Sequence, residues 1–311
     1  MLALLFPGQG SQRPAMGAPW QDHPSWRIVA TLSEAVSRDL APLLLEAEAD
    51  ELQATRNSQL ATFALSLIVL DAVQRSKLKE HLEAEAVAVA GHSLGEYTGL
   101  VASGALEPAE GARLVLARGE AMQLAAGQNP GTMAAILGLE MDDVVAVCQG
   151  IEGAWVANDN SPGQVVVAGT FEGVDGVATA ALERGAKRVV PLRVGGAFHT
   201  PLMKPAQARL DDALKTTIFA PARRVVVSNV DAAPHQDGFG SLLSAQLCSR
   251  VRWRESLVRL ASLGAAVFIE LGPGTELSGM VKRTLPGAAR ANVAYPDDLD
   301  RLAGLMARGP E

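Results

Sequence analysis

The chain lacks the features that mark several large classes of protein. Its 311 residues include only two cysteines, Cys148 and Cys248, with no C-x-x-C pair and no histidine-rich segment beside them. We therefore expect no metal site and interpret both as free thiols. The net charge is −7, so the basic excess of a general nucleic-acid-binding protein is absent. The most apolar helical run, residues 61–70, ends at Asp71, well short of the ~20 residues that a membrane span needs.

What remains is the composition of a globular protein, with 48% hydrophobic and 20% charged residues. A chain of this length can form one large domain, or one large and one small domain. The apolar start, residues 2–6, stops at Pro7-Gly8 and has neither the basic residues nor the length of a signal peptide. We therefore expect a cytoplasmic protein.

The order of the expected elements divides the chain into two units. Short β-prone runs at 2–6, 86–90, 225–229 and 267–271 are separated by helical segments, and the helical periodicity of residues 26–75 is interrupted near Pro42 and Asn57-Ser58. Residues 128–195 instead predict the order βαββαβ, with strands at 131–138, 154–158, 164–169 and 188–193, helices at 141–150 and 174–185, and a turn at 160–163. This order is typical of a ferredoxin-like domain. We predict that residues 128–195 form a small domain inserted into a large α/β domain of residues 1–127 and 196–311.

The most informative segment is Gly91-His92-Ser93-Leu94-Gly95, which follows the strand-like run 86–90 and precedes a helical run. Strand, sharp turn and helix around G-x-S-x-G form a nucleophile elbow, which lifts the serine hydroxyl above an α/β-hydrolase-like sheet. The elbow also places the N–H of Leu94 at a helix N-terminus, where partial positive charge favours an oxyanion. The segment predicts that Ser93 is a nucleophile, with an ordinary turn serine as the alternative.

A serine hydroxyl needs a base, and the chain offers five histidines. His23 and His235 lie beside proline in polar loops, and His81 lies in a charged stretch. The ring of His92, adjacent to Ser93, is expected to point away from the serine and to support the elbow. His199 remains as the candidate base, with a packed loop histidine as the alternative. Because no acidic residue stands at a convincing strand end, we expect a backbone carbonyl to orient the histidine, giving a dyad rather than a triad.

Six motifs in one order carry a resemblance to a known family. They are Phe6-Pro7-Gly8-Gln9-Gly10-Ser11-Gln12, Gly91-His92-Ser93-Leu94-Gly95-Glu96-Tyr97, Arg118-Gly119, Asn158-Asp159-Asn160-Ser161-Pro162-Gly163-Gln164, Ala197-Phe198-His199 and Glu270-Leu271-Gly272-Pro273-Gly274. The chain resembles the malonyl-CoA:acyl carrier protein transacylase family, which includes the acyltransferase domains of polyketide synthases. The match extends from about residue 2 to 285.

The resemblance implies a transfer in two half-reactions. Ser93, activated by His199, would take a malonyl group from malonyl-CoA and pass it to the pantetheine thiol of an acyl carrier protein, without a metal or other cofactor. The backbone N–H groups of Gln9 and Leu94 would form the oxyanion hole. Arg118 would bind the free malonyl carboxylate, since a guanidinium meets a carboxylate with two parallel hydrogen bonds. Without the resemblance, a surface arginine on a helix is the favoured interpretation of Arg118.

The resemblance also implies the substrate pocket, formed by His92, Met122, Asn160 and Phe198. The ring of Phe198 would fill the space that an α-methyl group requires, which favours malonyl over methylmalonyl units. Where many bacterial members have Asn-Pro-Val-Gln-Trp, this chain has Ser249-Arg250-Val251-Arg252-Trp253. The main chain of Arg252 would then contact the histidine.

Several alternatives remain open at this point. A hydrolase of the same fold that strips acyl groups from carrier proteins would have no use for Arg118, and a scaffold would need neither Ser93 nor His199. The transacylase subunit of malonate decarboxylase is a third possibility. Family members are commonly monomers. An acidic carrier protein would dock on a local basic face, and the alternative is that these basic residues form an ordinary solvated surface. The candidate basic residues are Arg250, Arg252 and Arg254, with Lys187-Arg188 or Lys282-Arg283.

Overall fold

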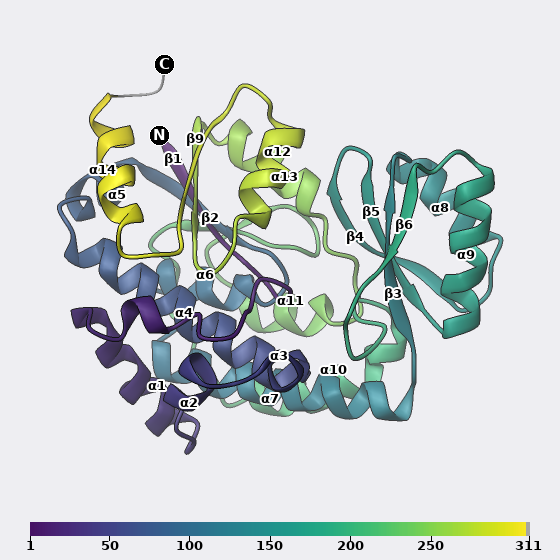
Figure 1. Ribbon diagram of the computed structural model, residues 1–311, viewed down its shortest axis with the longest axis horizontal. Helices are drawn as coiled ribbons and strands as arrows, with labels where there is room; N and C mark the ends of the chain where they lie inside the picture. The colour runs from purple at the N-terminus through teal and green to yellow at the C-terminus, as the bar shows by residue number, and fades with distance from the viewer. Residues whose placement is uncertain (309–311) are drawn as a thin grey trace.

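The computed structural model describes residues 1–308 and contains two β-sheets, the larger of which has helices on both faces (Figure 1). The six-stranded sheet has the order β10-β9-β1-β2-β7-β8. Its strands are β1 (Leu2–Phe6), β2 (Ala86–Gly91), β7 (Val225–Val227), β8 (Pro234–His235), β9 (Val267–Leu271) and β10 (Ala289–Val293). All neighbours are parallel except β8, which pairs antiparallel with β7. The predicted α/β class is confirmed.

Alternation along the strands builds a core on each face of this sheet. Leu2, Leu4 and Phe6 of β1 face a cluster with α4 (Thr55–Arg75) and α6 (Gly95–Ala102). Ala3 and Leu5 face the opposite cluster with α12 (Trp253–Ser262) and α13 (Glu276–Thr284). The remaining helices of the large unit are α1 (Ile28–Ala35), α2 (Ala41–Leu45), α3 (Ala49–Gln53), α5 (Lys79–Glu85), α7 (Pro108–Gln128), α10 (Lys204–Leu214), α11 (Phe239–Gln246) and α14 (Asp298–Arg308), with short 3₁₀ turns η1 (Ala18–Trp20), η2 (Pro24–Arg27) and η3 (Pro201–Met203).

The interruption predicted near Asn57-Ser58 lies three residues earlier, because Asn57 and Ser58 are both in the first turn of α4. The chain breaks instead at Ala54, whose ψ is 125°. The polar side chains that favour a break find partners locally. The side-chain amide of Asn57 donates to the backbone carbonyl of Glu51 at 3.0 Å, and the hydroxyl of Ser58 donates to the backbone carbonyl of Thr55 at 3.0 Å. Such local bonds let the helix begin with polar residues.

The second sheet is antiparallel and has the order β4-β5-β3-β6. Its elements follow one another as β3 (Thr132–Leu137), α8 (Met141–Gln149), β4 (Ala154–Ser161), β5 (Gln164–Gly169), α9 (Phe171–Glu183) and β6 (Arg188–Pro191). The element order βαββαβ is therefore as predicted. The boundaries differ by up to three residues. The largest differences are that α9 begins at Phe171 and that β4 continues through Ser161, so that the turn contains only Pro162 and Gly163, where Gly163 has a φ of +68°.

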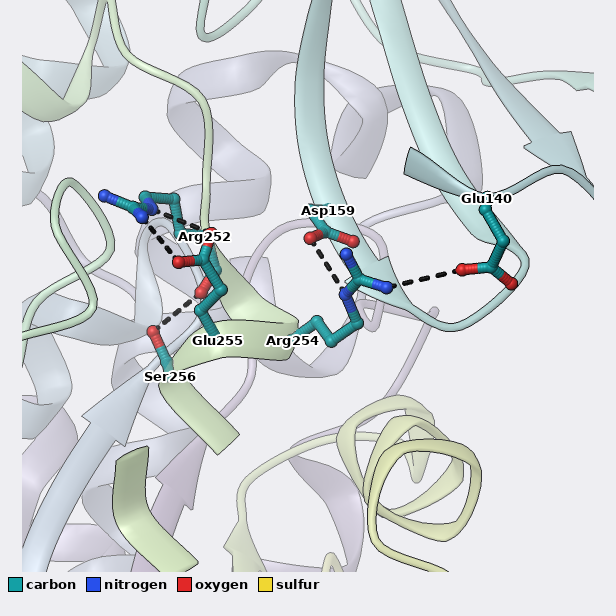
Figure 2. A network of polar contacts seen from close by, with 6 residues as sticks. All are labelled: Glu140, Asp159, Arg252, Arg254, Glu255 and Ser256. Atoms are coloured by element: carbon teal, nitrogen blue, oxygen red, sulfur yellow. Dashed lines mark hydrogen bonds and ion pairs between the residues drawn. The ribbon is translucent and has the colours of Figure 1, made fainter. Parts of the chain in front are cut away.

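The end of β4 forms polar contacts with α12 and with the segment just before it (Figure 2). Arg254 of α12 donates to the buried carboxylate of Asp159 at 3.0 Å and lies 3.4 Å from the carboxylate of Glu140. Beside this ion pair, the N–H of Asp159 donates to the carbonyl of Val251 at 2.9 Å. These contacts fix the end of β4, and with it Asn160, next to the carboxyl edge of the large sheet.

Candidate active site

The turn between β2 and α6 has the geometry of a nucleophile elbow. Ser93 has a φ of +51°, a strained conformation for a residue with a Cβ atom. The flanking glycines are required by close packing: a Cβ on Gly91 would collide with the backbone of Gly95, and one on Gly95 would collide with the carbonyl of Phe6. The turn lies where β1, β2 and β7 all end, at the carboxyl edge of the sheet, where open α/β sheets bind ligands.

Ser93 and His199 meet at this edge. Ser93 Oγ lies 2.8 Å from His199 Nε2, and His199 Nδ1 lies 2.9 Å from the carbonyl oxygen of Gln246. Because a carbonyl only accepts, Nδ1 carries the ring proton, and Nε2 is left to accept the proton of the serine hydroxyl. Gln246 is the last residue of α11, where carbonyl groups lack a partner within the helix. The helix end therefore sets the tautomer that a general base requires.

The prediction that the main chain of Arg252 orients the histidine is wrong, although a backbone carbonyl does so. That carbonyl belongs to Gln246, six positions earlier. The guanidinium of Arg252 instead forms an ion pair with Glu255, with Nε 2.9 Å from Oε1 (Figure 2). The motif predicted a nearby contact but gave no indication of which residue ends the preceding helix.

Burial keeps His199 neutral. The side chain is 5% exposed, and desolvation, with the positive charge of Arg118 as the second cause, lowers the pKa of His199 to about 3. Both effects disfavour the imidazolium form. At neutral pH the ring is therefore ready to accept a proton, and the bond to the carbonyl of Gln246 partly offsets the loss of basicity.

Arg118 of α7 lies in the interior, with 1% of its surface exposed, rather than on the surface of its helix. Its Nη1 donates to Gln59 Oε1 at 2.8 Å, and its Nη2 donates to Gln246 Oε1 and to Ser93 Oγ, both at 3.0 Å. Among residues 1–308 no carboxylate forms an ion pair with it, and its Nε has no partner. A buried guanidinium bonded only to neutral acceptors beside Ser93 is suited to an incoming anion.

The backbone of Ser93 is held by residues that the sequence analysis did not identify. The N–H of Ser93 donates to Asn229 Oδ1 at 2.6 Å, and its carbonyl accepts from Gln246 Nε2 at 3.0 Å. Gln246 Nε2 also donates to the buried carboxylate of Glu96 at 2.7 Å. Neither amide has a recognisable sequence pattern, because each reaches the elbow from a segment more than 130 residues away in the chain.

The other predicted site residues lie around this centre. Gln9 follows β1, and Leu94 precedes α6; within residues 1–308 neither N–H group donates to a protein acceptor, so both are available. The ring of His92 turns away from Ser93: its Nε2 lies 2.8 Å from Asn160 Oδ1, and its ring packs edge-on against Trp253. The sulfur of Met122 accepts from Gln59, and Phe198 is buried.

Two of the three arginines considered for carrier docking are already engaged. Arg252 pairs with Glu255, and Arg254 pairs with Asp159 and Glu140 (Figure 2). These ion pairs largely neutralise the two charges within the protein, so Arg252 and Arg254 do not offer a free basic surface for docking. Arg283, by contrast, donates to the neutral side chains of Ser161 and Gln164.

Residues 1–308 contain neither a clustered set of metal ligands nor a membrane-spanning helix. No group of three or more His, Cys, Asp or Glu side chains lies close enough together to hold a metal ion. None of the helices in this part of the chain combines the length and apolarity that crossing a bilayer takes.

An elbow serine bonded to a neutral histidine in an α/β protein is the arrangement found in serine-dependent acyltransferases and hydrolases. The family model described as acyl transferase domain matches residues 3–309. A malonyl CoA-acyl carrier protein transacylase of Bacillus subtilis is 38% identical over 307 residues, covering 96% of this chain and 95% of that protein. The chain therefore belongs to the acyl transferase family, among its malonyl-CoA:acyl carrier protein transacylases.

Solved structures agree with this assignment. The acyl-carrier-protein S-malonyltransferase of Burkholderia pseudomallei superposes with a TM-score of 0.90 at 37% identity, covering 98% of this chain and 99% of that one. A malonyl-transacylase in complex with a type II polyketide synthase acyl carrier protein also has a TM-score of 0.90, at 34% identity, covering 96% of this chain and 97% of that one.

Proposed function

We propose that this protein transfers a malonyl group from malonyl-CoA to the phosphopantetheine thiol of an acyl carrier protein through an ester on Ser93. The observation that carries the proposal is the buried guanidinium of Arg118, which bonds to the nucleophile and to two amide oxygens but to no carboxylate within residues 1–308. Such a site favours an acyl group that brings its own negative charge.

In the first half-reaction, His199 Nε2 accepts the proton of Ser93 Oγ while Oγ attacks the thioester carbonyl. The N–H groups of Gln9 and Leu94 stabilise the oxyanion. When the carbon–sulfur bond breaks, the CoA thiolate takes the proton from His199 and leaves as the thiol. In the second half-reaction the carrier thiol gives its proton to His199 and attacks the ester, and Oγ recovers the proton as the ester bond breaks.

Arg118 would hold the malonyl carboxylate with both of its Nη atoms. The carboxylate supplies the counter-charge that the free enzyme lacks at this position, so binding satisfies the guanidinium and places the thioester carbonyl over Ser93. A hydrolase of simple acyl chains would have no use for this buried charge.

The remaining pocket residues would shape the space around the acyl group. Phe198, buried beside His199, would exclude an α-methyl group, and His92 and Asn160 would join the elbow to the small sheet across the pocket. Discrimination by one methyl group is typically ~1–3 kcal/mol, which makes the malonyl preference substantial but not absolute.

The names of the relatives support the same donor and acceptor. They are malonyl CoA-acyl carrier protein transacylases, and one of the similar structures contains a carrier protein of a type II polyketide synthase. As part of this proposal, the protein acts as a monomer in the cytoplasm, needs no cofactor beyond its two substrates, and serves fatty acid or polyketide synthesis.

The proposal is tested by incubating the protein with radiolabelled malonyl-CoA, isolating it, and then adding a phosphopantetheinylated carrier protein. We expect label on Ser93, absent in Ser93→Ala and present in the matched variant Ser103→Ala, whose hydroxyl bonds only within α6. The label should then move to the carrier protein. Label on another residue, or release of free malonate in place of transfer, would reject the proposal.

A further inference from the structure

Side-chain amides form hydrogen bonds with both the N–H and the carbonyl of Ser93, the strained residue of the elbow. Asn229 Oδ1 accepts from the Ser93 N–H at 2.6 Å, while Asn229 Nδ2 donates to the carbonyl of Gly91 at 2.7 Å. Gln246 Nε2 donates to the Ser93 carbonyl at 3.0 Å. A positive φ at a residue other than glycine persists only where its surroundings enforce it. These two amides are the side chains that do so here.

Both amide residues are tied to one carboxylate. Glu96 Oε2 accepts from Gln246 Nε2 at 2.7 Å and from the backbone N–H of Asn229 at 3.2 Å. Glu96 is 1% exposed, and within residues 1–308 it forms no direct ion pair. Desolvation raises the pKa of Glu96, and its bonds with Gln246 and Asn229 oppose that rise.

The chemistry of these partners fixes which way the amide of Gln246 points. A carboxylate and a carbonyl only accept hydrogen bonds, so the end that faces Glu96 and the Ser93 carbonyl must be the NH₂ group. A guanidinium only donates, so the end that faces Arg118 must be the oxygen. If the amide turned over, donors would face Arg118 and an acceptor would face Glu96. The negative carboxylate thus orients Gln246, and Gln246 in turn holds both Ser93 and Arg118.

We propose that Glu96 is a positioning residue for acyl transfer, which holds the Ser93 backbone in its strained conformation through Gln246 and Asn229. The proposal rests on the proposed function, because its consequence is measured in the acyl-transfer rate. A buried carboxylate without an ion pair costs stability that an apolar side chain would not. Its chemical contribution is that it accepts and never donates, which no neutral amide or hydroxyl can guarantee.

The experiment compares Glu96→Gln with a matched control, Glu270→Gln. Glu270 is also fully buried, and its two oxygens accept from the backbone N–H groups of Leu277 and Ser278 at the start of α13, away from the elbow. The transfer rate is measured with malonyl-CoA and with acetyl-CoA at a temperature where both variants are folded. Each rate is divided by the concentration of reactive serine, which is titrated with a fluorophosphonate. We expect kcat to fall about 10- to 100-fold with both donors in Glu96→Gln, as a small misplacement of a reacting group causes, and to stay within about twofold in Glu270→Gln.

A double-mutant cycle tests the route through Gln246. Gln246→Leu removes all three side-chain bonds, to the Ser93 carbonyl, to Glu96 and from Arg118, but keeps the backbone carbonyl that orients His199. Because coupled residues give non-additive effects, Glu96→Gln should lower kcat little further in the Gln246→Leu background. If Glu96→Gln does not fold, Gln246→Leu alone must lower kcat with both donors.

Three results would overturn the proposal: an unchanged kcat in Glu96→Gln or in Gln246→Leu, a loss confined to malonyl-CoA, or losses that simply multiply in the double variant. Failure of the proposed function is distinguishable, because the wild-type protein itself would then transfer no malonyl group.

Discussion

Replacing Arg118 by methionine is the sharpest test of the site. Methionine keeps an apolar stem but removes the charge, so the malonyl carboxylate would enter a buried position without a partner. Breaking one side of a buried charge pair costs about 3 kcal/mol or more, which corresponds to a factor of about 100 in kcat/KM for malonyl-CoA. The same change leaves Gln59 Oε1 and Gln246 Oε1 without their donor, at about 1–3 kcal/mol of folding stability each.

Acetyl transfer should respond differently to Arg118→Met. An acetyl group brings no carboxylate, so its transfer does not need the guanidinium and should be spared or improved. The positive charge of Arg118 also lowers the pKa of His199, so its removal raises that pKa. Since His199 acts as a base only when neutral, the acidic limb of the acetyl-transfer pH profile should move to higher pH.

The assay is steady-state transfer to a carrier protein from malonyl-CoA and acetyl-CoA in parallel, across pH. Arg113→Met is the matched control, since Arg113 lies on the same helix but is exposed and pairs with Glu110. It should leave both donors and the pH profile unchanged. Equal losses with malonyl and acetyl donors would refute a carboxylate-binding role for Arg118.

Three further predictions concern strain, the contact between the sheets, and selectivity. Because Ser93 has a φ of +51°, Ser93→Gly should be about 1 kcal/mol more stable than Ser93→Ala in urea unfolding, although both are inactive; equal midpoints would deny the strain. Arg254→Met should cost about 2 kcal/mol at neutral pH by leaving the Asp159 carboxylate buried and alone. Burial already raises the pKa of Asp159, and loss of Arg254 raises it further, so this deficit should shrink as falling pH protonates the carboxylate; a deficit independent of pH would contradict the argument. Phe198→Leu should raise the methylmalonyl-to-malonyl ratio of kcat/KM about tenfold in a competition assay, and an unchanged ratio would exclude a selective role.

The parts of the site that the sequence predicts are those whose chemistry is local. The elbow is readable because its glycines, serine and following helix lie within a few consecutive positions, and steric packing requires each of them. His199 could be found because the chain has only five histidines, four of which stand in unsuitable contexts. The βαββαβ order was readable from the spacing of strand and turn signals, although the end of β4 was placed too early.

The parts that the sequence does not predict depend on which segments meet. Gln246 and Asn229 act through amide groups that have no sequence signature, and each reaches Ser93 only after the chain has crossed the sheet. Glu96 was visible in the motif, but an acid in the first turn of a helix is ordinary, and its burial depends on the whole fold. The arginines near Trp253 were visible as charges, whereas their acidic partners come from α12, from β4 and from the residue before α8.

The insertion of the antiparallel sheet between α7 and the segment that carries His199 has a consequence for how this enzyme can diversify. The serine, the histidine and the carbonyl that orients it all come from the parallel-sheet unit, and the inserted sheet reaches the elbow through Asn160 on His92. Under the proposed function, mutations that reorient the inserted sheet or change its surface would alter the space for the acyl group, while Ser93 and His199 keep their spacing. The choice of acyl group could then change in evolution without any change at Ser93 or His199.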